Sequence, residues 1–231
     1  MSQTTKATYV HTAQVHNLKS PRAVVPELLK LFSPESVLDV GCGIGTWLHE
    51  FASAGIGVFG IDGDFVDREQ LKEFISPDFF MPIDLQFPFN LNRKFDLVLS
   101  LEVAEHLPES SAIGFVNSLC QHSDVIIFSA AIPGQGGQNH LNEKWPDYWI
   151  KLFEKEGLKT YDILRPHFWD NEDVDWWYKQ NMLVFSRKAI EGILGQPFIN
   201  KVIHPDLFKQ NLDYIIYLQG YVKELECKLY L

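Results

Sequence analysis

Short runs of apolar, largely β-branched residues alternate along the chain with segments that have helical spacing. The first five strands are expected at 37–40, 58–64, 80–85, 95–103 and 124–132. Helices are expected between and around them, near 20–32, 46–55, 65–75, 110–121 and 146–156. Two further strands are expected at 158–164 and 181–187, on either side of an aromatic-rich insertion. Strands that are apolar on both faces and alternate with helices are typical of a parallel sheet covered on each side. The pattern therefore predicts an α/β fold.

Both ends of the chain predict helices. Ser20 and Pro21 are suited to start the first helix, as its N-cap and first residue. The tail, residues 205–231, has helical spacing and no strand signal. Its apolar residues follow a seven-residue repeat with one polar position: Phe208, Ile215, Val222 and Leu229, alternating with Asn211, Leu218 and Leu225. This spacing indicates a coiled-coil seam and hence a homodimer held by the C-terminal helix. A single helix packed on its own domain is the alternative.

Composition and charge narrow the possible partners. The chain of 231 residues is 46% hydrophobic and carries a net charge of −10. It has no basic cluster, so a nucleic-acid partner is not expected. Its three cysteines are far apart, which excludes a disulfide framework or a zinc knuckle. No segment has the roughly 20 apolar residues that a membrane span needs, and the first residues lack the apolar core of a signal peptide. We therefore expect a cytoplasmic protein.

A glycine-rich loop follows the first predicted strand. Asp39 precedes Gly41, Gly43 and Gly45, and a helix is expected directly afterwards. Glycines allow close approach of the backbone to a ligand, and a helix N-terminus offers free N–H groups. The G-x-G-x-G spacing differs from the G-x-G-x-x-G of dinucleotide sites and favours a smaller nucleoside ligand. Asp62, at the end of the second strand, is placed to accept hydrogen bonds from ribose hydroxyls.

Four segments make the chain resemble the class I methyltransferases that use S-adenosylmethionine. They are VLDVGCGIG (37–45), GIDGD (60–64), PIDLQ (82–86) and LVLSLEVAEHL (97–107). The resemblance covers residues 35–188 and implies a Rossmann-like, seven-stranded, mostly parallel sheet with helices on both faces. The implied organisation has an N-terminal cap and helix at 1–34, the methyltransferase domain at 35–188 and a C-terminal helical extension at 189–231.

The resemblance also implies the cofactor site. Asp39, Gly41, Cys42, Gly43 and Gly45 would hold the methionine end of S-adenosylmethionine, and Asp62 the ribose. Asp84 would reach the adenine amine, with Leu85 beside the ring. Leu101 and Glu102 would line the sulfonium side.

The acceptor is expected near two histidines that follow the fourth and fifth strands. His106 and His140 are the candidate bases for deprotonating an alcohol, and we favour His140. The loop around His140 carries hydrogen-bonding side chains that are suited to a polyhydroxylated ligand. The candidate substrate-binding residues are Gln135, Gln138, Asn139, Glu143 and Trp145. The loop is similar to that of bacterial methyltransferases from polysaccharide and sugar gene clusters. This similarity implies O-methylation of a sugar, a sugar nucleotide or a similar polar metabolite.

Three alternatives remain open at this point. Glu102, Glu105, His106 and His140 could bind a divalent metal ion, as similar E-x-x-E-H segments do in some small-RNA and quinone-precursor methyltransferases. Many relatives carry the segment without metal, so a metal is not favoured. The acceptor could be a non-sugar small molecule that is methylated on nitrogen or oxygen. The domain could also be a catalytically idle cofactor-binding scaffold in a glycan-assembly complex.

Overall fold

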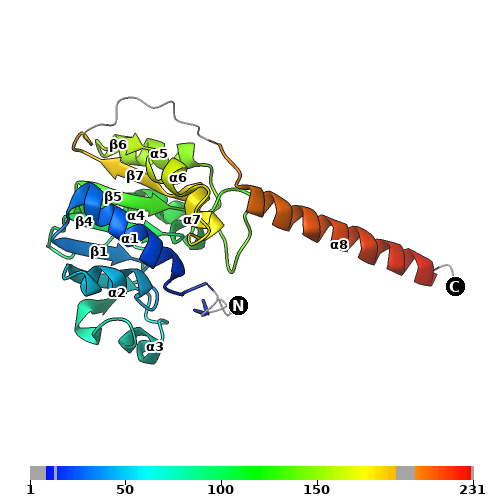
Figure 1. Ribbon diagram of the computed structural model, residues 1–231, viewed down its shortest axis with the longest axis horizontal. Coiled ribbons are helices and arrows are strands. Elements are labelled where there is room, and N and C mark those ends of the chain that lie inside the picture. The colour runs from blue at the N-terminus through cyan, green and yellow to red at the C-terminus, as the bar shows by residue number, and fades with distance from the viewer. Residues whose placement is uncertain (1–8, 13–14, 191–200, 230–231) are drawn as a thin grey trace.

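The computed structural model describes residues 9–12, 15–190 and 201–229 (Figure 1). Its centre is a seven-stranded sheet in the order β3-β2-β1-β4-β5-β7-β6. The strands are β1 (Ser36–Val40), β2 (Gly57–Asp62), β3 (Phe80–Pro82), β4 (Leu97–Leu101), β5 (Val125–Ser129), β6 (Lys159–Tyr161) and β7 (Leu183–Ser186). The first five strands pair in parallel, while β7 is antiparallel to both of its neighbours. The predicted fold, a mostly parallel sheet with flanking helices and a C-terminal helix, is confirmed.

Eight α-helices and three short 3₁₀ helices complete the described chain. The α-helices are α1 (Lys19–Phe32), α2 (Thr46–Ser53), α3 (Arg68–Lys72), α4 (Ala112–His122), α5 (Pro146–Lys155), α6 (Leu164–Phe168), α7 (Trp176–Asn181) and α8 (Pro205–Leu229). The 3₁₀ helices are η1 (Pro77–Phe79), η2 (Ala104–His106) and η3 (Glu109–Ser111). Figure 1 shows α8 projecting from the body of the molecule as a long arm.

Two apolar layers enclose the sheet, because successive strand residues point to opposite faces. Val37 packs with α1, α2, α6 and α7 on one face. Leu38 and Val40 pack on the other face with Phe115 of α4 and Phe153 of α5. Both faces of the central strands are therefore buried, as their apolar sequences require.

Three local predictions were wrong. The first helix begins at Lys19, and the side chain of Asn17 accepts a hydrogen bond from its first N–H. Ser20 instead donates to Asp175 at 2.6 Å, so a tertiary contact displaces it from the capping role. The helix expected at 65–75 shrinks to α3, which is capped by Asp67. The insertion at 165–178 folds in part into α6 and α7, which sequence analysis did not predict.

The predicted boundaries at 1–34 and 189–231 fall partly outside the described residues. None of the described helices combines the length and apolarity that a membrane crossing demands. The described part of α8 keeps the seven-residue apolar spacing, whereas the side chain of Leu229 lies outside the described set.

Candidate functional site

A large cavity lies at the carboxyl ends of β1, β2 and β4, where the loops after these strands converge. Its volume is about 1500 Å³. Sites for one small ligand usually measure roughly 300–1,000 Å³, so this cavity has room for two ligands side by side. Strands β1 and β4 are neighbours whose connections run in opposite directions, and α/β sheets bind ligands beside such a crossover.

The glycine loop forms one end of the cavity. The N–H groups of Gly41 and Cys42 donate to the carbonyl of Ile61, which ties the loop to the end of β2. Gly41 has φ +83°, and a Cβ placed there would lie 2.3 Å from a methyl group of Val103. Glycine is therefore required at position 41, both by backbone conformation and by the proximity of Val103.

Asp62 is the buried acid at this end of the cavity. Its two carboxylate oxygens accept hydrogen bonds from the N–H groups of Gly43, at 2.8 Å, and Gly63, at 2.6 Å. Burial raises the pKa of Asp62 to about 6, against the lowering effect of these two hydrogen bonds. Each oxygen keeps a second lone pair, so Asp62 can still accept two further hydrogen bonds from a ligand.

The other predicted cofactor residues divide into two groups. Most of them line the cavity, namely Gly41, Cys42, Gly43, Asp62, Asp84, Leu85, Leu101 and Glu102. Asp39 and Gly45 do not. Asp39 lies beneath the loop, where burial and the nearby Asp62 raise its pKa to about 8. A Cβ on Gly45 would contact Ile75 at 3.1 Å, so this glycine permits packing of the loop against the region after α3.

At the other end of the cavity, Glu143 holds the loop that carries His140. One Glu143 oxygen accepts from the N–H of Gly136 and pairs with His140 Nδ1 at 2.9 Å, while the other accepts from the N–H of Gly134. Burial opposes ionisation of Glu143, but these hydrogen bonds lower its pKa below the usual value. The pairing fixes the tautomer of His140, because a hydrogen on Nδ1 leaves a lone pair on Nε2. Glu143 does not line the cavity.

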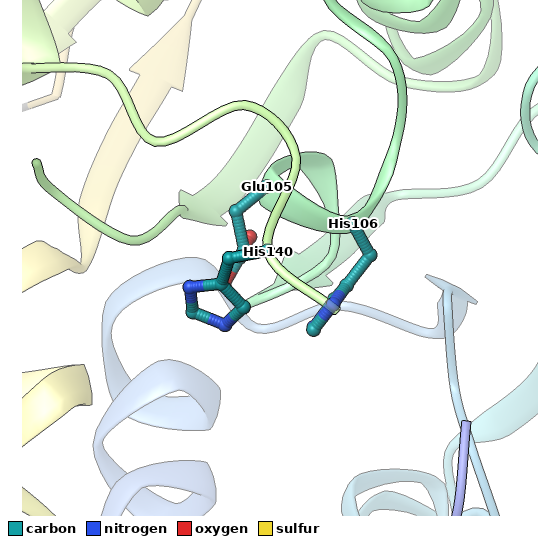
Figure 2. Close-up of side chains that lie close together, drawn as sticks. All are labelled: Glu105, His106 and His140. Carbon is teal, nitrogen blue, oxygen red and sulfur yellow. The ribbon is translucent and has the colours of Figure 1, made fainter. Parts of the chain in front are cut away.

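Glu105 and His106, on η2, complete a polar cluster with His140 (Figure 2). One ligand atom from each of the three residues lies within 4.8 Å of the other two. Neither carboxylate oxygen of Glu105 has a hydrogen-bond partner of good geometry among the described residues. The same is true of His106 Nδ1. Burial and the nearby Glu102 raise the pKa of Glu105 well above its usual value. Burial and His140 lower the pKa of His106 to about 4, so this ring is neutral at pH 7.

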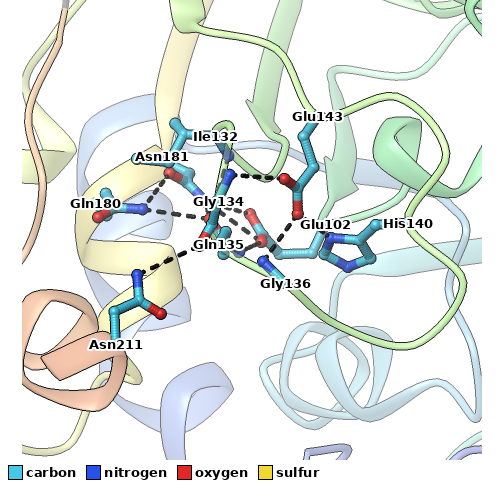
Figure 3. A network of polar contacts seen from close by, with 10 residues as sticks. All are labelled: Glu102, Ile132, Gly134, Gln135, Gly136, His140, Glu143, Gln180, Asn181 and Asn211. Atoms are coloured by element: carbon cyan, nitrogen blue, oxygen red, sulfur yellow. Dashed lines mark hydrogen bonds and ion pairs between the residues drawn. The ribbon is translucent and has the colours of Figure 1, made fainter. Parts of the chain in front are cut away.

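A second network immobilises Glu102 (Figure 3). Gln135 donates to its carboxylate at 2.7 Å, and Asn181 donates at 3.1 and 3.3 Å. Its N–H donates to Ser129, and its backbone takes φ +56°, a conformation that is rare without glycine. This network holds the Glu102 carboxylate beside Glu105, whose pKa it raises. Among the described residues, the groups close enough to share one ion are those of Glu105, His106 and His140, without Glu102.

Of the predicted substrate residues, Gln135, Gln138 and Asn139 line the cavity, whereas Trp145 does not. The ammonium group of Lys201 lies 5.6 Å from the centre of a Trp145 ring. Trp176 and Trp177, at the start of α7, do line the cavity. Other lining residues were not predicted from the sequence, namely Tyr9, His11, Gln210, Asn211 and Tyr214. They come from the N-terminal segment and the first turns of α8, which are distant in sequence and carry no shared motif.

Solved structures show the same fold at low sequence identity. The sugar N-methyltransferase KedS8 from Streptoalloteichus sp ATCC 53650 is 13% identical with a TM-score of 0.60, covering 82% of this chain and 99% of that one. Magnesium protoporphyrin IX methyltransferase from Synechocystis PCC 6803, with bound S-adenosylhomocysteine, is 21% identical with a TM-score of 0.56. That match covers 79% of this chain and 90% of the other.

Sequence comparison points the same way. The ubiquinone biosynthesis O-methyltransferase of Rhodopseudomonas palustris (strain HaA2) is 24% identical over 147 residues, which is 62% of this chain. The match covers 54% of that enzyme, so this chain spans about half the length of that relative. The family model described as a methyltransferase domain matches residues 10–181, and this range contains both the glycine loop and the His140 loop. The chain therefore belongs to the methyltransferase-domain family, whose fold binds S-adenosylmethionine.

Proposed function

We propose that this chain transfers a methyl group from S-adenosylmethionine to a hydroxyl group of a sugar, a sugar nucleotide or a similar polar metabolite. The observation that carries the proposal is the His140–Glu143 pair. It places an imidazole with a fixed tautomer on the wall of a cavity whose other end is the glycine loop. A nucleophile and a methyl donor bound together in this cavity would both lie beside that base.

The glycine loop and the acids after β2 and β3 are suited to hold the cofactor. Gly41 and Gly43 leave space for its methionine end, and the free lone pairs of Asp62 face the cavity where the ribose hydroxyls would bind. Asp84 and Leu85 line the adenine end. When bound, S-adenosylmethionine supplies an electrophilic methyl group on a positively charged sulfur.

His140 would act as the general base. An alcohol is too weak an acid to ionise near pH 7, so its proton must leave as the C–O bond forms. As the acceptor oxygen takes the methyl group from the sulfur of the bound cofactor, Nε2 of His140 would take the proton that this oxygen loses. Glu143 then stabilises the imidazolium through the hydrogen bond at Nδ1. Because His106 is neutral at pH 7, it does not repel the positive charge that develops on His140.

The chemistry of the lining supports a polar acceptor. Gln138 and Asn139 line the cavity beside His140. Trp176 and Trp177 line it from α7, and indole rings can pack on the C–H faces of a sugar. The names of related proteins fit hydroxyl and sugar chemistry, since they include ubiquinone O-methyltransferases and a sugar N-methyltransferase.

A methyl-transfer assay with a set of acceptors tests this proposal. The set would contain nucleotide sugars, free sugars, catechols and amino sugars, incubated with S-adenosylmethionine carrying a labelled methyl group. Label on a sugar hydroxyl is the expected result. Label on a catechol or an amine would overturn the sugar assignment and keep methyl transfer. Cofactor binding without turnover of any acceptor would favour a catalytically idle scaffold.

A metal-assisted version of the same reaction is the second candidate. The observation that favours it is the buried Glu105 carboxylate, which has no well-placed donor among the described residues and lies beside two imidazoles. These groups fit a divalent cation: Glu105 would offer oxygen, His106 and His140 would offer nitrogen, and Glu143 would orient His140 from behind. The cation would acidify the acceptor hydroxyl in place of a base.

Chelation separates the two versions. If a cation is required, treatment with EDTA abolishes activity and Mg²⁺ or Mn²⁺ restores it. Glu105→Gln would then remove Mn²⁺ binding measured by calorimetry while cofactor affinity stays unchanged. Full activity after exhaustive chelation would eliminate the metal and leave His140 as the base.

A further inference from the structure

Among the described residues, the contacts between the arm formed by α8 and the body of the molecule lie near the beginning of the helix. Leu207 is buried against the body, and Asn211 donates to the carbonyl of Gly134 at 3.3 Å. Every residue from Phe208 to Leu225 is exposed, and Figure 1 shows the arm leading away from the body. Most of the stability of a helix in a protein comes from packing of its apolar side, and the outer part of α8 lacks that packing.

One side of this arm is apolar. Ten large apolar side chains between Phe208 and Leu225 are 38–66% exposed. At 100° per residue, eight of them fall on one side of the helix: Phe208, Leu212, Tyr214, Ile215, Leu218, Tyr221, Val222 and Leu225. The opposite side carries Lys209, Asp213, Gly220 and Glu224. We call the eight residues the α8 apolar face.

The size of the α8 apolar face matches an interface between proteins. Eight side chains of this kind, each about half exposed, present roughly 700 Å² of apolar surface. Each partner in an interface of standard size buries about 800 Å². Monomeric proteins seldom leave a continuous apolar patch larger than a few hundred Å² exposed, so the face is suited to a partner.

The charge of α8 excludes an anionic membrane and a nucleic acid as partners of the α8 apolar face. From Pro205 to Leu229, α8 carries three lysines against four acidic residues, and the whole chain has a net charge of −10. Helices that bind anionic membranes are rich in lysine and arginine on their polar side, and nucleic-acid surfaces are strongly basic. α8 has neither property.

We propose that the α8 apolar face pairs with the same face of a second copy of this chain. Ile215, Leu218, Val222 and Leu225 follow one another at alternating three- and four-residue steps. In this spacing, each helix presents both the knobs and the holes that a second copy needs, so the surface is complementary to itself. Tyr214 and Tyr221 widen the seam on one flank.

The proposed interface overlaps the cavity wall, because Tyr214 belongs to both. Gln210, Asn211 and Tyr214 line the cavity, and Ile215 follows directly. Asn211 holds Gly134, and the N–H of Gly134 donates to the carboxylate that pairs with His140 (Figure 3). The helix that holds the second copy therefore also supports the His140 loop.

Light scattering of the purified chain at 5–100 µM would test the pairing without any acceptor. We expect the intact chain to have at least twice its monomer mass of 26.6 kDa. Val222→Glu should reduce the mass to that of the monomer, because paired copies would bury two carboxylates against each other. Gly220→Glu is the matched control: it adds the same charge two residues away on the polar side, where no atom lies within 4 Å of a new Cβ, and should leave the assembly intact.

Circular dichroism should show both variants folded, and Leu218→Glu should repeat the effect of Val222→Glu. A monomeric chain at 100 µM would overturn the proposal, as would equal masses for the two glutamate variants. Flotation of the chain with vesicles of phosphatidylcholine and phosphatidylserine would also overturn it, by identifying a lipid surface as the occupant. None of these readouts depends on methyl transfer, so the pairing and the proposed activity fail separately.

Discussion

The two ends of the cavity are built in different ways. At the glycine-loop end, the Asp62 carboxylate is held by two backbone N–H groups, and the loop is tied to β2. At the His140 end, three of the four side-chain polar atoms of Glu105 and His106 have no well-placed partner among the described residues. The Asp62 carboxylate is thus held before a ligand binds, and Asp39 Oδ2 beneath the loop is the atom at this end without a partner among the described residues. The His140 end contains more such groups, and they lie where a ligand or ion can satisfy them.

Because of this difference, we expect the two ends of the cavity to control different quantities, namely cofactor affinity and turnover. A site made of backbone hydrogen bonds suits an invariant cofactor, because its geometry does not depend on side-chain rotamers. Unsatisfied buried polar groups are costly, and binding an acceptor or a cation can recover that cost. We therefore expect changes at the glycine-loop end to alter cofactor affinity, and changes at the His140 end to alter kcat.

His140→Ala should have the largest effect. Loss of a positioned base is expected to reduce kcat by roughly 10²–10⁴-fold, while the Kd for the cofactor stays within about twofold. Steady-state kinetics and calorimetry measure the two quantities. His167→Ala, which removes an exposed histidine on α6, is the control and should be neutral. Near-normal turnover of the His140 variant would transfer the role of base to His106.

Asp62→Ala should weaken binding of S-adenosylmethionine by about 1.5–3 kcal/mol, or roughly 10–150-fold in Kd. The reason is the loss of hydrogen bonds to a charged acceptor. Asp64→Ala changes a neighbouring carboxylate whose side chain is 92% exposed and should alter the Kd little. If calorimetry finds equal affinities for two folded variants, Asp62 does not bind the cofactor.

Gly137→Ala should decrease kcat by about tenfold without altering cofactor affinity. A Cβ at this position would lie 2.3 Å from Nε2 of His140, so the imidazole would have to move. Gly136→Ala is the control. It also strains the backbone, because Gly136 has φ +68°, but no atom lies within 4 Å of the new Cβ. Similar kcat values for the two variants would show that the position of His140 is not critical.

Cofactor affinity should fall severalfold, and by no more than about tenfold, as the pH decreases from 7 to 5. The pKa of Asp62 in the free protein is about 6, so its carboxylate is ionised at pH 7 and mostly protonated at pH 5. The protonated group is a weaker acceptor for ribose hydroxyls. Calorimetry with S-adenosylhomocysteine across this range gives the profile, and Asp62→Asn should flatten it. An unchanged slope in that variant would assign the titration to another group.

Sequence analysis was most informative where function depends on local backbone. The G-x-G-x-G spacing lies in one turn, and the acid lies at the end of one strand. Both are visible in short stretches of sequence, so the loop and Asp62 could be located without tertiary information. The pairing of Glu143 with His140 was accessible for the same reason, because the two residues lie three positions apart in one loop.

The remaining parts depend on contacts between distant segments. Ser20 has the sequence of an N-cap, but its hydroxyl bonds to Asp175, 155 residues away. Asn181 binds Glu102 across 79 positions, and nothing in its own segment indicates a buried amide. Trp145 was predicted to bind substrate because it follows the polar loop that carries His140, but Trp176 and Trp177, more than 30 residues further along the chain, line the cavity in its place.

The shared use of α8 has a kinetic consequence. Under the proposed pairing, one rigid rod supports the wall beside the acceptor at its base and a second molecule along its length. Where self-association steadies this wall, acceptor binding and self-association become linked equilibria, and each strengthens the other by the same factor. Activity per molecule would decline on dilution below the dissociation constant of the assembly, so the abundance of the protein would itself set its output.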